Sequence, residues 1–112
     1  MKKENIIKKS YEYTQIINNA KHISNNYFSI YYKEKELDKN RYGISVPKKI
    51  GNAVVRNKIK RQIKSIIDNN KKSIQNTLDY VIIVRKGLLD LKYKNIEEAL
   101  LNLMKKIGDN NE

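Results

Sequence analysis

The fold of this chain follows from the stretch RYGISVPKKIGNAVVRNKIKRQIK, residues 41–64, which predicts a strand, a turn and a helix. Apolar residues alternate with small or charged ones over RYGISV, which is the period of a half-buried strand. The apolar side of this strand consists of Tyr42, Ile44 and Val46. Pro47 ends the strand because proline cannot donate a hydrogen bond to a sheet ladder. The pair Gly51-Asn52 then supplies a turn and a helix N-cap.

The predicted helix that follows has two unlike sides. At about 100° per residue, its apolar residues fall within an arc of roughly 120°. They are Val55, Ile59, Ile63, Ile66 and Ile67. A neighbouring arc carries the polar and basic residues Asn57, Lys60, Arg61 and Lys64. Arg56 lies at the border, where its stem can cover apolar surface while the guanidinium reaches outward. One side therefore suits a protein core and the other suits phosphates.

Positive charge is concentrated in this part of the chain. The interval 39–67 contains nine lysines or arginines and no acidic residue. The alternative is a solvated charged face, but such a face normally carries Glu or Asp one helical turn from its lysines. Solubility alone would also be served by mixed charge. The pattern therefore favours a polyanionic partner with regularly spaced phosphates.

Composition narrows the class of protein. A chain of 112 residues predicts one domain with a modest core. Its net charge of +12 indicates an anionic partner, nucleic acid first and an anionic membrane surface second. No apolar run approaches the ~20 residues of a membrane-spanning helix, and the first residues lack the pattern of a secretory signal. The absence of cysteine excludes disulfides and thiolate metal sites, so we expect a cytoplasmic protein without a membrane partner.

Residues before the motif predict a helix and a strand. Ser10 is a plausible N-cap for a helix to about Asn19, whose apolar stripe is Tyr13, Ile16, Ile17 and Ala20. Residues 21–34 predict a strand with aromatic residues on both faces. If its open face coincides with that of the next strand, a shallow floor results, suited to an unpaired nucleic-acid strand. This floor would consist of Ser29, Tyr31, Gly43 and Ser45.

Residues after the motif predict a central strand and a last helix. The run VIIV (81–84) is expected to be covered on both faces. Arg85 and Lys86 follow it, either as an extension of the phosphate-binding surface or as two solvated charges. Asn95 and Glu98 have the spacing of a capping box, and an amphipathic helix closed by Gly108 follows. This last stripe is expected to pack in the core.

The motif KKIGNAVVRNKIKR (48–61) resembles the signature of the bacterial ribonuclease P protein component, Arg-Asn-Arg followed by x-Lys-Arg. Arg56, Asn57, Lys60 and Arg61 match this pattern, whereas Lys58 replaces the usual arginine. Lysine offers a point charge where arginine offers a planar fork. The resemblance extends over nearly the whole chain, through the YFSIYY strand, the DYVIIVRK strand and the final helix.

The resemblance implies an α+β fold, a single-domain α/β sandwich with the order α-β-β-(β)-α-β-α, in which the bracketed strand is short and optional. It also implies a left-handed crossover from strand 41–46 through helix 52–69 to strand 80–85, although such units are normally right-handed. Residues 1–112 would form one RNA-binding domain, with 1–9 and 109–112 flexible.

The resemblance also implies two binding surfaces. The motif helix would bind the catalytic RNA subunit through Lys48, Lys49, Arg56, Asn57, Lys58, Lys60, Arg61 and Lys64. A groove would hold the single-stranded 5′ leader of precursor tRNA through Tyr13, Ile17, Ser29, Tyr31 and Ser45. Tyr13 suits base stacking. Ile17 stands where the family commonly has an aromatic residue, so van der Waals contact is expected there instead.

Chemistry for a protein-borne active site is missing from the sequence. There is no HExxH motif, no Cys/His pair and no cluster of carboxylates in the basic region, and His22 is the only histidine. We therefore expect no catalytic and no metal-binding residue. In the family, the RNA subunit carries catalysis with Mg²⁺.

The predicted function is that of the protein subunit of ribonuclease P, an endoribonuclease that removes 5′ leaders as a ribonucleoprotein. Its predicted partners are the catalytic RNA and precursor tRNA, with no obligate protein partner. Two alternatives are a structural, for example ribosomal, RNA-binding protein of similar fold and a non-specific basic nucleic-acid binder.

Overall fold

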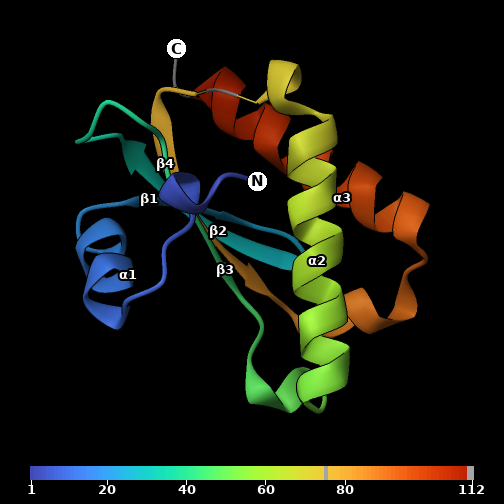
Figure 1. The fold of residues 1–112 in the computed structure, drawn as a ribbon. Coiled ribbons are helices and arrows are strands. Elements are labelled where there is room, and N and C mark those ends of the chain that lie inside the picture. Colours follow the sequence, from blue (N-terminus) through green and yellow to red (C-terminus); the bar gives the residue numbers. More distant parts are fainter. Residues whose placement is uncertain (75, 111–112) are drawn as a thin grey trace.

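The computed structural model describes residues 1–74 and 76–110, which form three helices and a four-stranded sheet (Figure 1). The helices are α1 (Ser10–Ile17), α2 (Ala53–Asn69) and α3 (Tyr93–Asn110). The strands are β1 (Lys21–Ser24), β2 (Phe28–Glu34), β3 (Tyr42–Ser45) and β4 (Leu78–Val84). The predicted order is confirmed, with the optional short strand present as β1.

The sheet has the strand order β1-β2-β4-β3. Strands β1 and β2 are antiparallel, as are β2 and β4, whereas β3 and β4 are parallel. The segment β3-α2-β4 is therefore a crossover between adjacent parallel strands. Its left-handed sense stays an expectation from the family resemblance.

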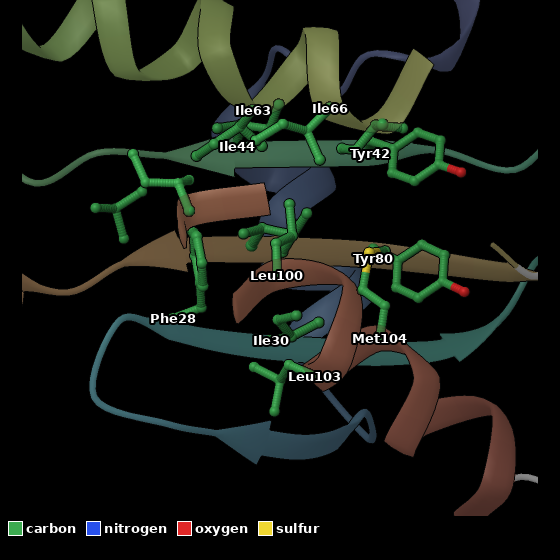
Figure 2. Close-up of a cluster of buried hydrophobic side chains, with 14 of the residues drawn as sticks. Phe28, Ile30, Tyr42, Ile44, Ile63, Ile66, Tyr80, Leu100, Leu103 and Met104 are labelled. Carbon is green, nitrogen blue, oxygen red and sulfur yellow. The ribbon is translucent and has the colours of Figure 1, made fainter. Parts of the chain in front are cut away.

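Helices α2 and α3 cover one face of the sheet, which we call the covered face (Figure 1). Figure 2 shows side chains of both helices pointing onto Ile30, Ile44 and Tyr80 of three neighbouring strands. The α2 residues buried here are Ile59, Ile63, Ile66 and Ile67, which confirms the predicted apolar arc except at Val55, which is only partly buried. Burying one such side chain contributes roughly 1.5–3 kcal/mol, so this face supplies most of the hydrophobic stabilisation.

The opposite face, which we call the open face, carries only α1 and the N-terminal segment. Ile16 of α1 and Ile7 pack on Val81 of β4, and all three are buried. Because Val81 and Ile82 are both inaccessible, β4 is the central strand that the VIIV run predicts.

The N-terminal segment also lies along the outer edge of β3. Ile6 forms a parallel bridge with Tyr42, and the amide of Ile7 donates to the carbonyl of Tyr42 at 2.9 Å. Residues 1–9 were expected to be flexible, but Ile7 is 2% exposed in the structure.

Arg41, one of the nine cations counted between residues 39 and 67, is buried in an ion pair and is not part of an exposed basic surface. The Arg41 guanidinium donates to an Asp79 carboxylate oxygen at 2.9 Å, and the Arg41 amide donates to the other oxygen at 2.8 Å. Arg41 is 7% exposed and Asp79 is fully buried. Glu12 of α1 lies 3.8 Å from the same guanidinium. Arg41 therefore holds α1 and the sheet together, because β3 and β4 bring it against Asp79.

Several element boundaries differ from the sequence-based predictions. The segment 21–34 is two strands, because the Asn25 side chain accepts hydrogen bonds from the amides of Tyr27 and Phe28 and turns the chain. Helix α1 begins at Ser10, so Ser10 is not its N-cap, and it ends at Ile17. Helix α3 begins at Tyr93 and runs through Gly108 to Asn110, so the predicted capping box at Asn95 and the stop at Gly108 are wrong.

Candidate nucleic-acid interface

On the open face, partly buried side chains of α1 and the sheet form one surface, which we call the groove. Tyr13 and Ile17 of α1 are half-buried beside Tyr31 of β2 and Ile83 of β4. Strand register places Ser29 opposite Ile83 and Ser45 beside it, so both serines lie on this same face. The structure therefore brings together the five residues predicted for the groove: Tyr13, Ile17, Ser29, Tyr31 and Ser45.

A glycine positions the tyrosine of α1. A Cβ atom at Gly43 would lie 2.6 Å from Cε1 of Tyr13, which is too close for two carbon atoms. The ring of Tyr13 therefore lies directly on the backbone of β3, and its hydroxyl donates to the carbonyl of Ile7 at 3.3 Å. Burial raises the pKa of Tyr13 above its ordinary value, so the phenol stays neutral at physiological pH.

His22, the only histidine in the sequence, is a groove residue to which no sequence motif points. It pairs with Tyr31 across the β1–β2 ladder, and the two ring centroids are 4.5 Å apart. Its Nε2 lies 2.5 Å from the hydroxyl of Ser29. A hairpin between β1 and β2 would have predicted this position, because residues opposite each other in an antiparallel pair share a face.

The two ends of the groove differ in charge. Near α1 lies the buried Arg41–Asp79 ion pair, whose guanidinium is 3.8 Å from Glu12. Beyond Ser29 and Ile83, a hollow of about 260 Å³ is lined by Lys49, Arg85 and Lys86, among others. The Arg85 guanidinium also donates to the carbonyl of Asn25 at 2.6 Å, which fixes it at this end. An aromatic floor that leads to cations matches a single strand with stacked bases and a charged backbone.

Helix α2 begins where its motif predicts. The side chain of Asn52 accepts a hydrogen bond from the amide of Val55 at 3.0 Å, as an N-cap residue does. Asn57 and Arg61 are exposed along the outer side of the helix, and Lys48 and Lys49 are exposed in the short turn before it. No acidic residue interrupts this surface between residues 39 and 67.

The cations of α2 point in two directions. Lys60 and Lys64 line a hollow of about 240 Å³ together with Tyr13 and Lys8, so they lie next to the groove of the open face. Lys58 instead faces α3 and η4 (Lys86–Asp90), because a step of two residues turns about 200° around a helix. Lys58 was predicted to bind RNA together with the other motif residues, but it lies on a different side of α2.

The described residues contain no cluster of metal-ligating side chains and no helix suited to crossing a membrane. Within residues 1–74 and 76–110, no three His, Cys, Asp or Glu side chains gather closely enough to hold a metal ion. Asp79 is occupied by Arg41, and Asp68 pairs with the amino group of Met1. Among the helices of this part of the chain, none is long and apolar enough to span a bilayer.

Comparison with known proteins gives one family over almost the entire length. The family model described as ribonuclease P matches residues 1–108. The ribonuclease P protein component of Mycoplasma capricolum subsp. capricolum is 49% identical over 108 residues, which cover 96% of this chain and 99% of that protein.

Solved structures agree in fold as well as in sequence. The Staphylococcus aureus RNase P protein superposes with a TM-score of 0.85 at 35% identity, covering 92% of this chain and 94% of that one. The RNase P protein from Thermotoga maritima gives a TM-score of 0.79 at 34% identity, covering 85% and 90% of the two chains.

Proposed function

We propose that this chain, which belongs to the bacterial ribonuclease P protein family, uses two surfaces to bind two RNAs. As the protein subunit of ribonuclease P, it is part of the ribonucleoprotein endonuclease that processes the 5′ leaders of precursor tRNA. In this proposal the groove of the open face holds the leader, and the outer side of α2 binds the catalytic RNA subunit.

The groove supports leader binding through its shape and chemistry. Tyr31 and His22 offer partly exposed ring surface on the sheet, and Ser29 offers a hydroxyl beside His22. Arg85 and Lys86 at the basic end suit the phosphates of an extended strand. Such a groove tells precursor from product, because mature tRNA lacks the strand that fills it. The effect is proposed to fall on substrate affinity, with bond breaking left to the RNA subunit.

The α2 surface supports binding of the catalytic RNA. It combines Arg56, Asn57, Lys60, Arg61 and Lys64 with Lys48 and Lys49 of the preceding turn. When these cations neutralise phosphates, counterions are released and neighbouring segments of the RNA can pack closely together. We propose that this lowers the Mg²⁺ concentration that the catalytic RNA needs.

Mg²⁺ itself is proposed to be held mainly by the RNA subunit. The chain's own carboxylates do not fit a Mg²⁺ site, which needs convergent oxygen ligands, because the described residues contain no such group. No step of the reaction is therefore assigned to a metal on the protein. We place this activity in the cytoplasm, in keeping with a cysteine-free chain.

A magnesium titration of precursor cleavage tests the proposal. Catalytic RNA is assayed with and without the protein, on precursors with and without a leader. We expect the protein to lower the Mg²⁺ requirement and to bind the leader-bearing substrate more tightly. An unchanged Mg²⁺ requirement together with equal affinity for both substrates would overturn the proposal, and would favour a non-specific basic binder. Stable comigration with ribosomal subunits in a gradient would favour a structural ribosomal protein.

Tyr31→Ala tests the groove separately. Base stacking on an aromatic ring contributes about 1–3 kcal/mol, so leader affinity should fall accordingly. Binding to the catalytic RNA alone should stay unchanged, because Tyr31 lies on the face opposite α2. Tyr31→Phe is the matched control, since it keeps the ring and should keep most of the affinity.

A further inference from the structure

An apolar hollow lies at the junction of α2, η4 and α3, on the side of α2 to which Lys58 points. Its volume is about 490 Å³, within the range of small-ligand sites. We call it the α2–α3 hollow. The residues lining it include Val55, Lys58, Leu89, Lys92 and Tyr93.

The exposed apolar side chains around this hollow are held there by the fold. Leu88 of η4 is buried, whereas the next residue, Leu89, is 49% exposed. Gly87 anchors the turn, because a Cβ atom there would lie 2.6 Å from the carbonyl oxygen of Asn26. Tyr93, the first residue of α3, is 40% exposed. Two large apolar side chains thus face solvent from positions that the backbone fixes.

The positive charge around the hollow favours an anionic ligand. Every residue lining it is neutral or cationic, with Lys58 on one side and Lys92 on the other. The N-terminus of the 18-residue helix α3 adds a partial positive charge beside Tyr93. A second copy of this chain, with its own charge of +12, would bring more cations against these lysines. An apolar floor between two cations suits a nucleotide, whose base is flat and whose phosphates are anionic.

We propose that the α2–α3 hollow binds one unpaired nucleotide of the catalytic RNA, with its base on Leu89 and Tyr93 and its phosphates on Lys58 and Lys92. This inference rests on the proposed binding of that RNA by α2. The hollow is continuous with α2 through Val55 and Lys58, and α2 lies on the opposite face of the sheet from the leader groove. The catalytic RNA, rather than the leader, is therefore the source of the nucleotide.

Equilibrium binding of the full chain to catalytic RNA, without precursor tRNA, tests the base contact. Leu89→Ser and Tyr93→Ala should each weaken binding about tenfold, as expected for loss of a stacked base. The chain offers matched controls: Leu37 is 48% exposed and Tyr11 is 58% exposed, both outside the hollow. Leu37→Ser and Tyr11→Ala should bind like the unaltered chain. Thermal unfolding of all four variants shows whether any loss comes from the fold.

A cross-link identifies the occupant. Because the chain has no cysteine, Leu89→Cys provides a single attachment point for a photoactivated group. In the reconstituted holoenzyme the cross-link should reach one unpaired nucleotide of the catalytic RNA. Cross-links to a second protein chain, to precursor tRNA only, or to scattered RNA positions would each overturn the proposal.

The two proposals fail in different ways. Lys58→Ala and Lys92→Ala should each make the slope of log affinity against log salt shallower, by the contribution of about one phosphate contact. If Arg61→Ala weakens RNA binding while the Leu89 and Tyr93 variants bind normally, only the hollow proposal is overturned. If Arg61→Ala also has no effect, the assignment of α2 to the catalytic RNA fails first.

Discussion

The two faces of the sheet are built from the same four strands but differ in how deeply their side chains are buried. On the covered face, Phe28, Ile30 and Tyr32 of β2 are all buried beneath α3 and its neighbours. On the open face, Ser29 and Tyr31 from the same strand are only half-buried. The difference lies in the cover, because 17- and 18-residue helices seal one face while the eight-residue α1 reaches only part of the other.

This contrast separates stability from binding along a single strand. Alternation sends successive side chains to opposite faces, so neighbouring residues serve different purposes. The face that is sealed stabilises the fold. The face that is left partly uncovered keeps aromatic rings and hydroxyls available to an unpaired strand of RNA.

The largest expected effect comes from the one charged contact buried beneath α1. Arg41→Ala should lower the free energy of unfolding by about 3–5 kcal/mol, because it leaves Asp79 buried without its cation. Urea denaturation measures the loss. Replacing both partners together, as Arg41→Met with Asp79→Leu, should restore much of the stability. A variant Arg41→Ala that remains stable but binds RNA poorly would return Arg41 to the phosphate-binding surface.

Neighbouring residues of β2 give the most direct comparison of the two faces. Ile30→Ala should destabilise the fold by about 2–5 kcal/mol, because the residue is fully buried under α3. Tyr31→Ala should cost far less stability but should weaken leader binding. The two changes are scored by denaturation and by precursor affinity. Equal losses of stability would mean that the open face is as tightly packed as the covered face.

Gly43→Ala probes how the groove is shaped. The added methyl group would displace the ring of Tyr13, so leader affinity should fall by about as much as after loss of one stacked base, roughly tenfold. The double variant with Tyr13→Ala should bind no worse than Tyr13→Ala alone, because both changes act on the same ring. Additive losses in precursor-binding assays would show that Gly43 acts independently of Tyr13.

Arg61→Ala should produce a smaller effect, confined to the catalytic RNA. Arg61 is exposed on α2, and its loss should reduce the salt dependence of binding by about one phosphate's worth. Stability should be nearly unchanged. Binding measured over a range of salt concentrations separates this outcome from that of Arg41→Ala, which should leave the slope intact.

Alkaline pH should lower the stability of the fold through two buried tyrosines, whereas no such effect is expected at neutral pH. Burial raises the pKa of both Tyr42 and Tyr80, whose stacked rings lie 5.5 Å apart on the covered face. A raised folded pKa means that this stabilisation is complete below the unfolded pKa of about 10 and is lost as pH rises further. Unfolding experiments above that pH should show falling stability, while tyrosinate absorbance shows these rings titrating late. Tyr42→Phe should make the decline shallower.

The sequence was sufficient for features that depend on local period. The apolar side of strand 41–46 and the apolar arc of α2 follow from geometry within one element, and Tyr42, Ile44 and Val46 are buried in the core as predicted. The predicted half-burial of this strand is wrong, because Gly43 on its other side is also buried, beneath Tyr13 of α1. The direction of Lys58 also follows from the turn of about 100° per residue in a helix. It was missed because Lys58 was considered only as part of the motif.

Features that depend on strand pairing could not be predicted from the residues alone. Arg41 and Asp79 are 38 positions apart and meet only because β3 and β4 are neighbours. His22 reaches Tyr31 only because Asn25 turns the chain, and a continuous strand over 21–34 would have kept them apart. The start of α3 was predicted too late, because Asn95 was taken as the N-cap. In the structure it lies inside the first turn of the helix, which begins at Tyr93.

The bridge between Ile6 and Tyr42 has a consequence for self-association. Strand β3 is the last in the sheet, and its outer backbone groups would otherwise be free to pair with a strand of another molecule. The N-terminal segment occupies that position, as the bond between the Ile7 amide and the Tyr42 carbonyl shows. Removing this segment would take away basic residues and would also leave the edge of β3 unpaired. Chains shortened in this way would be prone to aggregate when their RNA is absent.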